Sequence, residues 1–326
     1  MTPTTIPARH ALAALALACA AGAAQAATLY VSSEKDDALT MIDLATLQVT
    51  GTVATCKRPR HMQLAAGGKQ LVVACTESGK ADVIDLASGK SVRRIDLGDD
   101  PEIFDLSPDG KTLYVSNEDD GEMGVIDVAS GKRTGAVKVG QEPEGVKVSP
   151  DGKTVFVTSE VASMVHVVDA ASGKVVKNIK VGKRPRRFAI SPDGAELWVS
   201  NELDASVSVI DTAKLEVVDT LRFELKGARS EDITPVGLTF SRDGKRAFVG
   251  LGKANHVAFI DVASRKVQQL VLVGKRAWSV ALNADESRLF VVNGLSDDLT
   301  VVDVAAAKAV KTIPVGRVPH TAVVVE

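Results

Sequence analysis

The chain has 326 residues, and its 39 Lys and Arg against 41 Asp and Glu give a formal net charge of −2. So balanced a surface has no general attraction for nucleic acid or for an anionic membrane, which argues against both as partners. After residue 26, no apolar run approaches the length of a bilayer-spanning helix, so no membrane span is expected.

Residues 1–26 are predicted to be a cleaved signal peptide, and residues 27–326 to be one domain. Arg9 lies in a short polar start, and residues 11–21 form an Ala-rich apolar segment that is too short to span a bilayer. Residues 24–26 (Ala-Gln-Ala) fit the small-x-small rule for cleavage. The expected location of the mature protein is therefore the periplasm.

An alternative for the leader is a lipid anchor at Cys19, which follows Leu17 and Ala18. The leucine stands one place too near the cysteine for the usual motif, so cleavage after residue 26 is favoured. Cleavage removes Arg9 and no acid, which leaves 38 basic against 41 acidic residues and changes the net charge to −3.

The rest of the chain carries an internal repeat that is marked by an aspartate. The spacings are 42, 42, 42, 42, 50 and 42 residues, and the aspartates are Asp43, Asp85, Asp127, Asp169, Asp211, Asp261 and Asp303. A fixed period of about 40 residues is typical of a repeat architecture. Because each Asp precedes a turn, we expect its carboxylate to accept turn N–H groups rather than to bind metal.

Each unit contains four short apolar runs, rich in Val and Ile, that are separated by turn residues. In the third unit the first run is Leu113-Tyr-Val-Ser-Asn117, and the last is followed by the turn Ser149-Pro-Asp-Gly152. Runs of about 4–6 residues have the length of strands and are too short for helices. Seven four-stranded antiparallel units predict an all-β fold, the seven-bladed β-propeller.

Both ends of the domain are predicted to complete the first blade. Residues 28–31 align with the second strand of a unit and residues 321–326 with the innermost strand, so their pairing closes the ring. A column of large residues supports this register, since six of its seven members are aromatic. We expect the column in the core: Tyr30, Val72, Tyr114, Phe156, Trp198, Phe248 and Phe290.

Two cysteines remain after the leader. Cys56 ends the last strand of the first unit and Cys75 ends the leading strand of the second, so both are expected on the same face of the disc. In an oxidising compartment we favour a disulfide between them, which closes a loop of about 20 residues and contributes roughly 3 kcal/mol in the chain-entropy model. The alternative is a pair of free structural thiols.

The loops that lead into the innermost strands are expected to meet at one mouth of the central channel. Six of the seven share a proline, and Ala277 takes its place in the other: Pro59, Pro101, Pro143, Pro185, Pro235 and Pro319. The neighbouring residues vary between units, which leaves them free for function. The predicted residues for binding a ligand or partner are Arg60, His61, Glu102, Glu144, Arg186, Arg276, Trp278 and His320.

The arginines and His320 suit a small anionic or mixed-charge molecule, with Trp278 as an apolar wall. The alternative is a set of surface ion pairs between neighbouring loops, each of which contributes little to stability. The fifth unit is eight residues longer than the others, within residues 223–234. This insert is interpreted as a lid or docking loop at the same mouth, or else as a tolerated surface insertion.

A column of acids lies near these loops, at Glu34, Glu118, Glu160 and Glu202. Scaffolding of the blades is the favoured explanation. A metal site with His61 and His320 is the alternative, but no ligand-type spacing supports it. No Cys-x-x-Cys-His haem motif and no Gly-x-x-x-x-Gly-Lys phosphate loop occurs, so neither a metal nor a cofactor is predicted.

The units resemble the YVTN-type β-propeller repeat. Its leading strand reads here Leu-Tyr-Val-Ser-Asn at 113–117, Val-Phe-Val-Thr-Ser at 155–159 and Leu-Trp-Val-Ser-Asn at 197–201. The resemblance covers residues 28–326. Within that family the chain looks most like the periplasmic propellers associated with pyrroloquinoline-quinone (PQQ) dependent catabolism, which implies a place beside a quinoprotein oxidation system.

PQQ dehydrogenases are also propellers, with a tryptophan at a fixed place in each repeat. Only Trp198 and Trp278 occur here, at different repeat positions, so the chain is not expected to be a PQQ enzyme. The favoured function is a non-catalytic, monomeric periplasmic propeller that binds a protein partner or a small anionic ligand at the channel mouth. The alternatives are a lactone hydrolase, because lactonases also use seven-bladed propellers, and a structural envelope protein.

Overall fold

The computed structural model describes residues 1–2 and 27–326. The predicted signal peptide and the alternative anchor at Cys19 fall almost wholly on residues 3–26, which lie outside the described part. Among the described residues there is no long apolar helix of the kind that crosses a bilayer.

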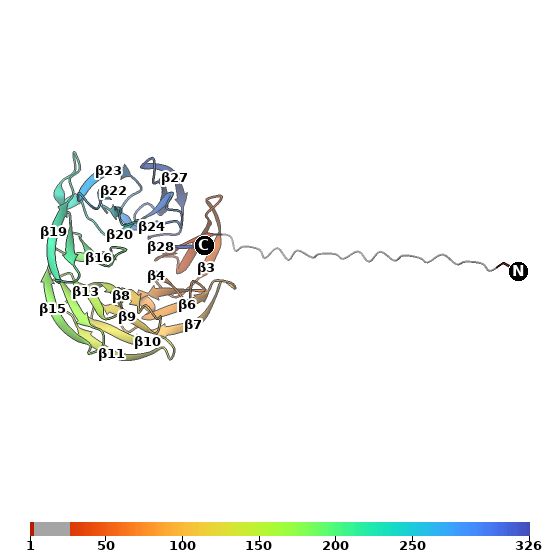
Figure 1. The fold of residues 1–326 in the computed structure, drawn as a ribbon, viewed down its shortest axis with the longest axis horizontal. Coiled ribbons are helices and arrows are strands. Elements are labelled where there is room, and N and C mark those ends of the chain that lie inside the picture. The colour runs from red at the N-terminus through yellow and green to blue at the C-terminus, as the bar shows by residue number, and fades with distance from the viewer. Residues whose placement is uncertain (3–26) are drawn as a thin grey trace.

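Seven four-stranded antiparallel sheets form a ring around a central axis, as Figure 1 shows, and the predicted seven-bladed β-propeller is confirmed. Blade 1 consists of β28 (Pro319–Val325), β1 (Thr28–Ser33), β2 (Ala38–Asp43) and β3 (Gln48–Ala54). Blade 2 consists of β4 (Pro59–Ala65), β5 (Gln70–Cys75), β6 (Lys80–Asp85) and β7 (Lys90–Asp96). Blade 3 consists of β8 (Pro101–Leu106), β9 (Thr112–Asn117), β10 (Glu122–Asp127) and β11 (Lys132–Lys138).

The other four blades follow the same plan. Blade 4 consists of β12 (Pro143–Val148), β13 (Thr154–Ser159), β14 (Met164–Asp169) and β15 (Lys174–Lys180). Blade 5 consists of β16 (Pro185–Ile190), β17 (Glu196–Asn201), β18 (Ser206–Asp211) and β19 (Glu216–Arg222). Blade 6 consists of β20 (Leu238–Phe240), β21 (Arg246–Gly250), β22 (His256–Asp261) and β23 (Lys266–Leu272). Blade 7 consists of β24 (Ala277–Leu282), β25 (Arg288–Asn293), β26 (Asp298–Asp303) and β27 (Lys308–Pro314).

The helical content is small. Two short 3₁₀ helices, η1 (Thr76–Ser78) and η2 (Ser230–Asp232), are the helices of the described chain. In each blade the strand named first above lies next to the axis and the strand named last lies at the rim, as the labels in Figure 1 indicate. The disc therefore presents two faces, and the innermost strands all run from the same face to the other.

The ring is closed by the two ends of the domain, as predicted. The last strand, β28, pairs antiparallel with β1, and Leu29 lies opposite Val324. The core consists of aliphatic layers between neighbouring blades. All seven members of the predicted aromatic column are buried within these layers, because a blade cannot cover its own two apolar faces and must pack against its neighbours.

The repeated aspartate has the predicted structural role in every blade. Its carboxylate accepts a hydrogen bond from the backbone N–H of the turn that follows, at 2.7 Å from Thr46 to Asp43 and at 2.7 Å from Ala306 to Asp303. The other five aspartates make the same contact. These residues lie in the turns between the third and the outermost strand of each blade, far from the channel, so they set the blade geometry.

Cys56 and Cys75 form a disulfide, with their Cα atoms 5.7 Å apart. The bond joins the turn after β3 to the end of β5, so it links blade 1 to blade 2. Both residues are buried.

Candidate functional site

The innermost strands carry a bulge at the end where they enter the channel. In six blades the ladder register shifts directly after the first residue of the strand, for example between Pro59 and Met62. A bulge interrupts the alternation of a strand, so consecutive side chains can turn to the same side. Seven of the eight predicted binding residues lie within these bulges: Arg60, His61, Glu102, Glu144, Arg186, Trp278 and His320.

The residue before each bulged strand adopts a left-handed backbone. This holds for Arg58, Asp100, Glu142, Arg184, Arg276 and Val318, with φ between 42° and 61°. Left-handed non-glycine residues are uncommon, but the recurrence in six blades shows that the conformation belongs to the repeated turn. It places one variable side chain at the same position in each loop of the mouth.

Arg60 connects three blades on one side of the mouth. Its guanidinium pairs with the carboxylate of Glu102 in the next blade. Its Nε lies 3.6 Å from Oε1 of Glu34 in the preceding blade. The other oxygen of Glu34 accepts a hydrogen bond at 3.1 Å from Nε of Arg58.

Arg186 has the same role on the other side. It pairs with Glu160 and lies 3.3 Å from Glu144 and 3.7 Å from Glu202. The neighbouring Arg184 contacts Glu160 at 2.7 Å and Glu202 at 3.2 Å. The acids of the predicted scaffolding column on these blades are therefore the counterions of the mouth arginines.

Arg187 is the functional residue that sequence reasoning missed. It pairs with Glu144, and its Nη2 lies 3.1 Å from Nε2 of His320, on the opposite side of the channel. Its signal in the sequence is its place as the second residue after Pro185, the same place that His61 takes after Pro59.

The ion pairs of the mouth are buried rather than on the surface. Arg60 and Arg186 are 6% and 5% exposed, and Glu102 and Glu144 are 2% and 1% exposed. The free energy lost when such charges leave water can exceed the free energy gained from their attraction, so a buried network of ion pairs is weak evidence for stability. Clusters of buried charged groups with shifted pKa values are common at functional sites, so this network marks a candidate site.

The carboxyl groups of this network differ in pKa. Burial raises the pKa of Glu102, and repulsion from Glu144 raises it further against the attraction of Arg60. Burial also acts to raise the pKa of Glu144, but the guanidinium groups of Arg186, Arg187 and Arg60 outweigh it and lower this pKa. Burial raises the pKa of Glu160 to about 7, against the attraction of Arg186.

The two predicted histidines lie deeper in the channel and are held neutral. Burial lowers the pKa of His61 to about 3, and the charge of Arg187 adds to this effect. Burial also lowers the pKa of His320 well below its ordinary value, helped by Arg60 and Arg187. The ring of His61 packs edge-on against Phe104, at 4.9 Å between centroids.

Arg276 differs from every other arginine of the mouth, because no described carboxylate forms an ion pair with it. Its guanidinium lies 4.2 Å from the centroid of the Trp278 ring, and Arg186 lies 5.2 Å from the same ring. Burial lowers the pKa of Arg276, Glu202 offsets this in part, and Arg186 lowers it further. The charge of Arg276 thus faces the site without a counterion among the described residues.

A cavity of about 180 Å³ lies among these groups, and we call it the mouth cavity. Its polar lining consists of Glu34, Arg58, Arg60, Arg186 and Arg276, with Trp278 as a wall. Trp278 is 7% exposed, and its indole Nε1 has no hydrogen-bond partner among the described residues. The arrangement suits a small ligand with a carboxylate or a polarised carbonyl.

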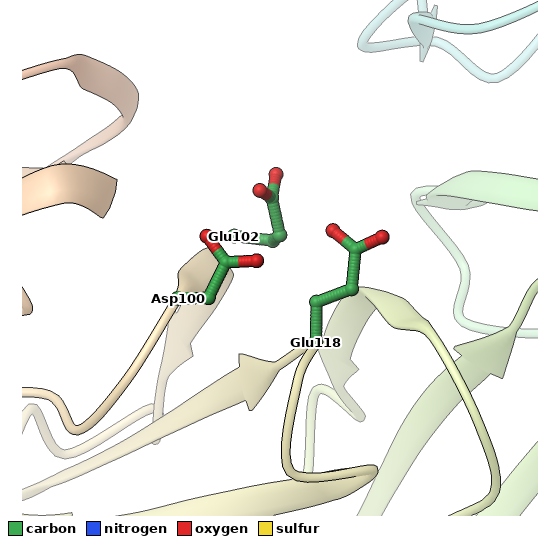
Figure 2. A group of neighbouring side chains, drawn as sticks. All are labelled: Asp100, Glu102 and Glu118. Carbon is green, nitrogen blue, oxygen red and sulfur yellow. The ribbon is translucent and has the colours of Figure 1, made fainter.

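A group of acids lies beside Arg60. Figure 2 shows the side chains of Asp100, Glu102 and Glu118 as neighbours, and one carboxylate oxygen of each lies within 4.8 Å of the other two. Carboxylate oxygens are the ligands that Ca²⁺ and Mg²⁺ prefer. Of the described residues, these are well placed to hold a cation, although Arg60 already neutralises Glu102.

The insert of blade 5 lies between β19 and β20, on the mouth face. It lines a separate cavity of about 360 Å³, with Arg222, Phe223, Leu225 and Ile233 among its walls. None of its residues lines the mouth cavity among the described groups.

The chain matches two family models in part. The model of the YNCE-like β-propellers matches residues 10–104 and 141–192, and that of the seven-bladed β-propeller lactonases matches residues 173–313. Each match covers less than half of the chain. The lactonase match includes Arg186, Arg276 and Trp278. Among curated proteins, none matches the chain significantly.

Solved structures share the fold over most of the chain. A chain of the hydrazine synthase of Kuenenia stuttgartiensis is 26% identical, with a TM-score of 0.76 over 85% of this chain and 92% of that one. The periplasmic gluconolactonase PpgL of Pseudomonas aeruginosa is 22% identical, with a TM-score of 0.78 over 93% and 99%. A functionally unknown protein from Desulfotomaculum acetoxidans DSM 771 is 17% identical, with a TM-score of 0.77 over 91% and 98%.

Significant structural matches number 1703 chains, so likeness of fold says little about function on its own. The comparisons establish similarity to two propeller families, one of them a lactonase family, and the site residues must carry any more specific conclusion.

Proposed function

We propose that this protein binds a small lactone in the mouth cavity and hydrolyses it. The observation that carries the proposal is the guanidinium of Arg276, which lies over Trp278 without a counterion among the described residues. Arg276 is half-buried. A half-buried positive charge that has no counterion is suited to a ligand whose negative charge arrives with it or develops during the reaction.

The mechanism follows from the lining of the mouth cavity. A lactone carbonyl oxygen directed at Arg276 is polarised, and a water molecule adds to the carbonyl carbon. Glu34 is the carboxylate that lines the same cavity, so it takes the proton of this water. The oxygen that becomes negative is stabilised by Arg276 and Arg186.

The tetrahedral species then collapses. The bond from the carbonyl carbon to the ring oxygen breaks, and the ring oxygen takes the proton back from Glu34 to leave as a hydroxyl group. The product is a hydroxy acid, whose carboxylate the arginines hold until release. One water is consumed for each lactone opened.

Two comparisons support this choice over simple binding. The lactonase model matches the segment that contains Arg276 and Trp278. PpgL, described as a periplasmic gluconolactonase, shares the fold over nearly its whole length. The link to PQQ-dependent oxidation and the periplasmic location stay predictions, because neither family match names such a system.

The test is a panel of sugar and aliphatic lactones, with acid release followed by pH-stat with and without added Ca²⁺. We expect Arg276→Met to lower kcat/KM by about 100-fold or more, the usual effect of removing an oxyanion donor. Lys275→Met is the matched control, because it removes an equal charge from the same loop but its side chain is exposed and does not line the mouth cavity.

Glu34→Gln distinguishes catalysis from binding. We expect it to lower kcat by about 100-fold while the protein still binds the product acid, because the amide cannot accept the proton of water. Glu77→Gln, at an exposed position, is the control. If no lactone is opened under any condition while the acid binds to wild type and not to Arg276→Met, the site binds anions without catalysing.

A further inference from the structure

The central channel is filled unevenly around its axis. The fourth residue after the proline of each inner strand is polar and paired in blades 2 to 4. There Asp105 accepts a hydrogen bond from Gln63 at 2.8 Å and pairs with Lys147 at 2.9 Å. The same register position in the remaining blades holds smaller or apolar residues: Ala189, Thr239, Ala281 and Val323. Among the described residues, space is therefore left mainly on the side of the channel formed by blades 5, 6, 7 and 1.

Two cavities occupy this side of the channel below the mouth cavity. The inner chamber, of about 220 Å³, is lined by His61, Arg187, Trp278 and His320 on its upper side. The lower chamber, of about 700 Å³, opens at the opposite face of the disc. The inner chamber shares Trp278 with the mouth cavity, and it shares three apolar residues with the lower chamber: Phe188, Leu238 and Val280.

The lining changes in character along this path. Four arginines line the mouth cavity. In the lower chamber Phe188, Ile190, Leu282 and Val324 form the apolar part of the wall. The charged part of that wall consists of Lys147, Arg242, Glu286 and Glu326. Gly237 lies in the wall of the inner chamber, where its lack of a side chain lets the chain of blade 6 lie directly against the backbone of Trp278 and Ser279. An arginine-rich end and an end with an apolar strip in a mixed wall thus follow one another along the channel.

We infer that the ligand of this site is an amphiphile, a lactone or hydroxy acid with an aliphatic chain. Its polar head lies in the mouth cavity against Arg276, and its chain passes Trp278 and extends toward the lower chamber. The inference rests on the proposed function for the lactone head, and it adds the substrate class. The orientation follows from the mouth end, where four arginines line the cavity and the guanidinium of Arg276 has no counterion among the described residues.

The direct test is the affinity of straight-chain carboxylates, measured by calorimetry on the full chain below their micelle concentrations. Each methylene that leaves water for the apolar wall strengthens binding by about fourfold. Octanoate has four more methylenes than butanoate, so we expect its dissociation constant to be lower by about 250-fold. A dissociation constant that does not change with chain length overturns the inference.

A variant that narrows the lower chamber provides the second test. Ala281→Trp should remove most of the gain from butanoate to octanoate and leave butanoate binding unchanged, and Ala189→Phe should act in the same direction. Ala136→Trp, at an exposed position of the rim strand β11, is the matched control and should keep the full gain. Equal gains in all three variants, with melting curves that show folded protein, count against the inference.

The result for the amphiphilic ligand can be distinguished from the result for lactone hydrolysis. Hydrolysis of short lactones without any effect of chain length would leave the lactonase proposal standing and reject the amphiphile. A strong chain-length effect without hydrolysis of any lactone would support the amphiphile as ligand and reject the catalytic step.

Discussion

Glu160 gives the mouth a measurable dependence on pH. It is 5% exposed and lies between Arg184 and Arg186, and burial raises its pKa to about 7. The folded protein therefore holds this proton more tightly than the unfolded chain, whose pKa is near 4.5. The resulting stabilisation is complete below about pH 4.5 and is lost as the pH rises through about 7.

We expect Glu160→Gln to remove this loss. Between pH 5 and pH 8 the free energy of unfolding of the wild type should fall by up to about 3 kcal/mol more than that of the variant. Urea unfolding at both pH values measures the difference, and Glu77→Gln, which alters an exposed acid, should follow the wild type. Parallel curves for Glu160→Gln and wild type would show that Glu160 does not bind the proton in the folded state.

The identity of the mouth residues could be predicted from the sequence, but their interactions could not. The shared proline marks the place of Arg60, Glu102 and Arg186 in each unit, since a repeat aligns them whatever their chemistry. Pairing and burial depend on which residue stands at that place in the neighbouring blade. The counterion role of Glu160 and the cross-channel contact of Arg187 with His320 therefore emerge only in three dimensions.

At the scale of elements, the shortest inner strand is the one that shapes the channel. The chain before β20 does not pair like the other inner strands, and it lies against β24. The N–H of Gly237 donates to the carbonyl oxygen of Trp278 at 2.9 Å. A Cβ on Gly237 would lie 2.6 Å from that oxygen and 2.8 Å from Cα of Ser279. Both are backbone atoms, which cannot move aside as a flexible side chain can.

Gly237→Ala should therefore separate β20 from β24 and shift Trp278. We expect it to lower the free energy of unfolding by about 1–3 kcal/mol, the range for overpacking in a filled interior, and to weaken ligand binding at the mouth cavity. Gly51→Ala is the control, because a Cβ there meets nothing within 4 Å. Urea unfolding and tryptophan fluorescence report the two effects, and equal results for both variants would contradict the close packing.

The insert of blade 5 is a segment whose conformation cannot be predicted from the repeat. Its length and its place at the mouth follow from the sequence, because the 50-residue spacing locates it. Its conformation does not, since no other unit has a counterpart. In the structure the insert contains η2 and lines a cavity that is separate from the mouth cavity. This position supports neither the predicted lid nor the tolerated surface insertion over the other.

For the whole molecule, the ring was predictable because one unit cannot be stable alone. Each four-stranded sheet has two apolar faces that it can cover only by packing against its neighbours. Because the sheets are twisted, seven of them packed side by side close into a ring. The site follows from the same closure, since the loops meet only if the disc is complete. The uneven filling of the channel could not be predicted from the sequence in the same way. Its prediction requires knowing which side chains of all the inner strands point into the channel, and the bulges change that alternation.

Ring closure depends on β28, which forms the inner strand of blade 1 and lies between β4 and β24 in the ring. Deleting residues 319–326 removes the ladder opposite Leu29, Tyr30 and Val31 and exposes the edge of β1. We expect the truncated protein to lose its cooperative melting transition and to aggregate through this edge. Deleting Glu326 alone is the control, because this residue is exposed and follows the end of the strand.

The closure argument also predicts how function responds. Because β28 carries His320 and borders the mouth cavity at Pro319, an opened ring should lose ligand binding together with its cooperative melting. Calorimetric scans and binding measurements on the same samples test this coupling. A truncated protein that melts in one sharp transition at the wild-type temperature would mean that six blades and three strands are enough, and that the seam between the two ends does not hold the disc together.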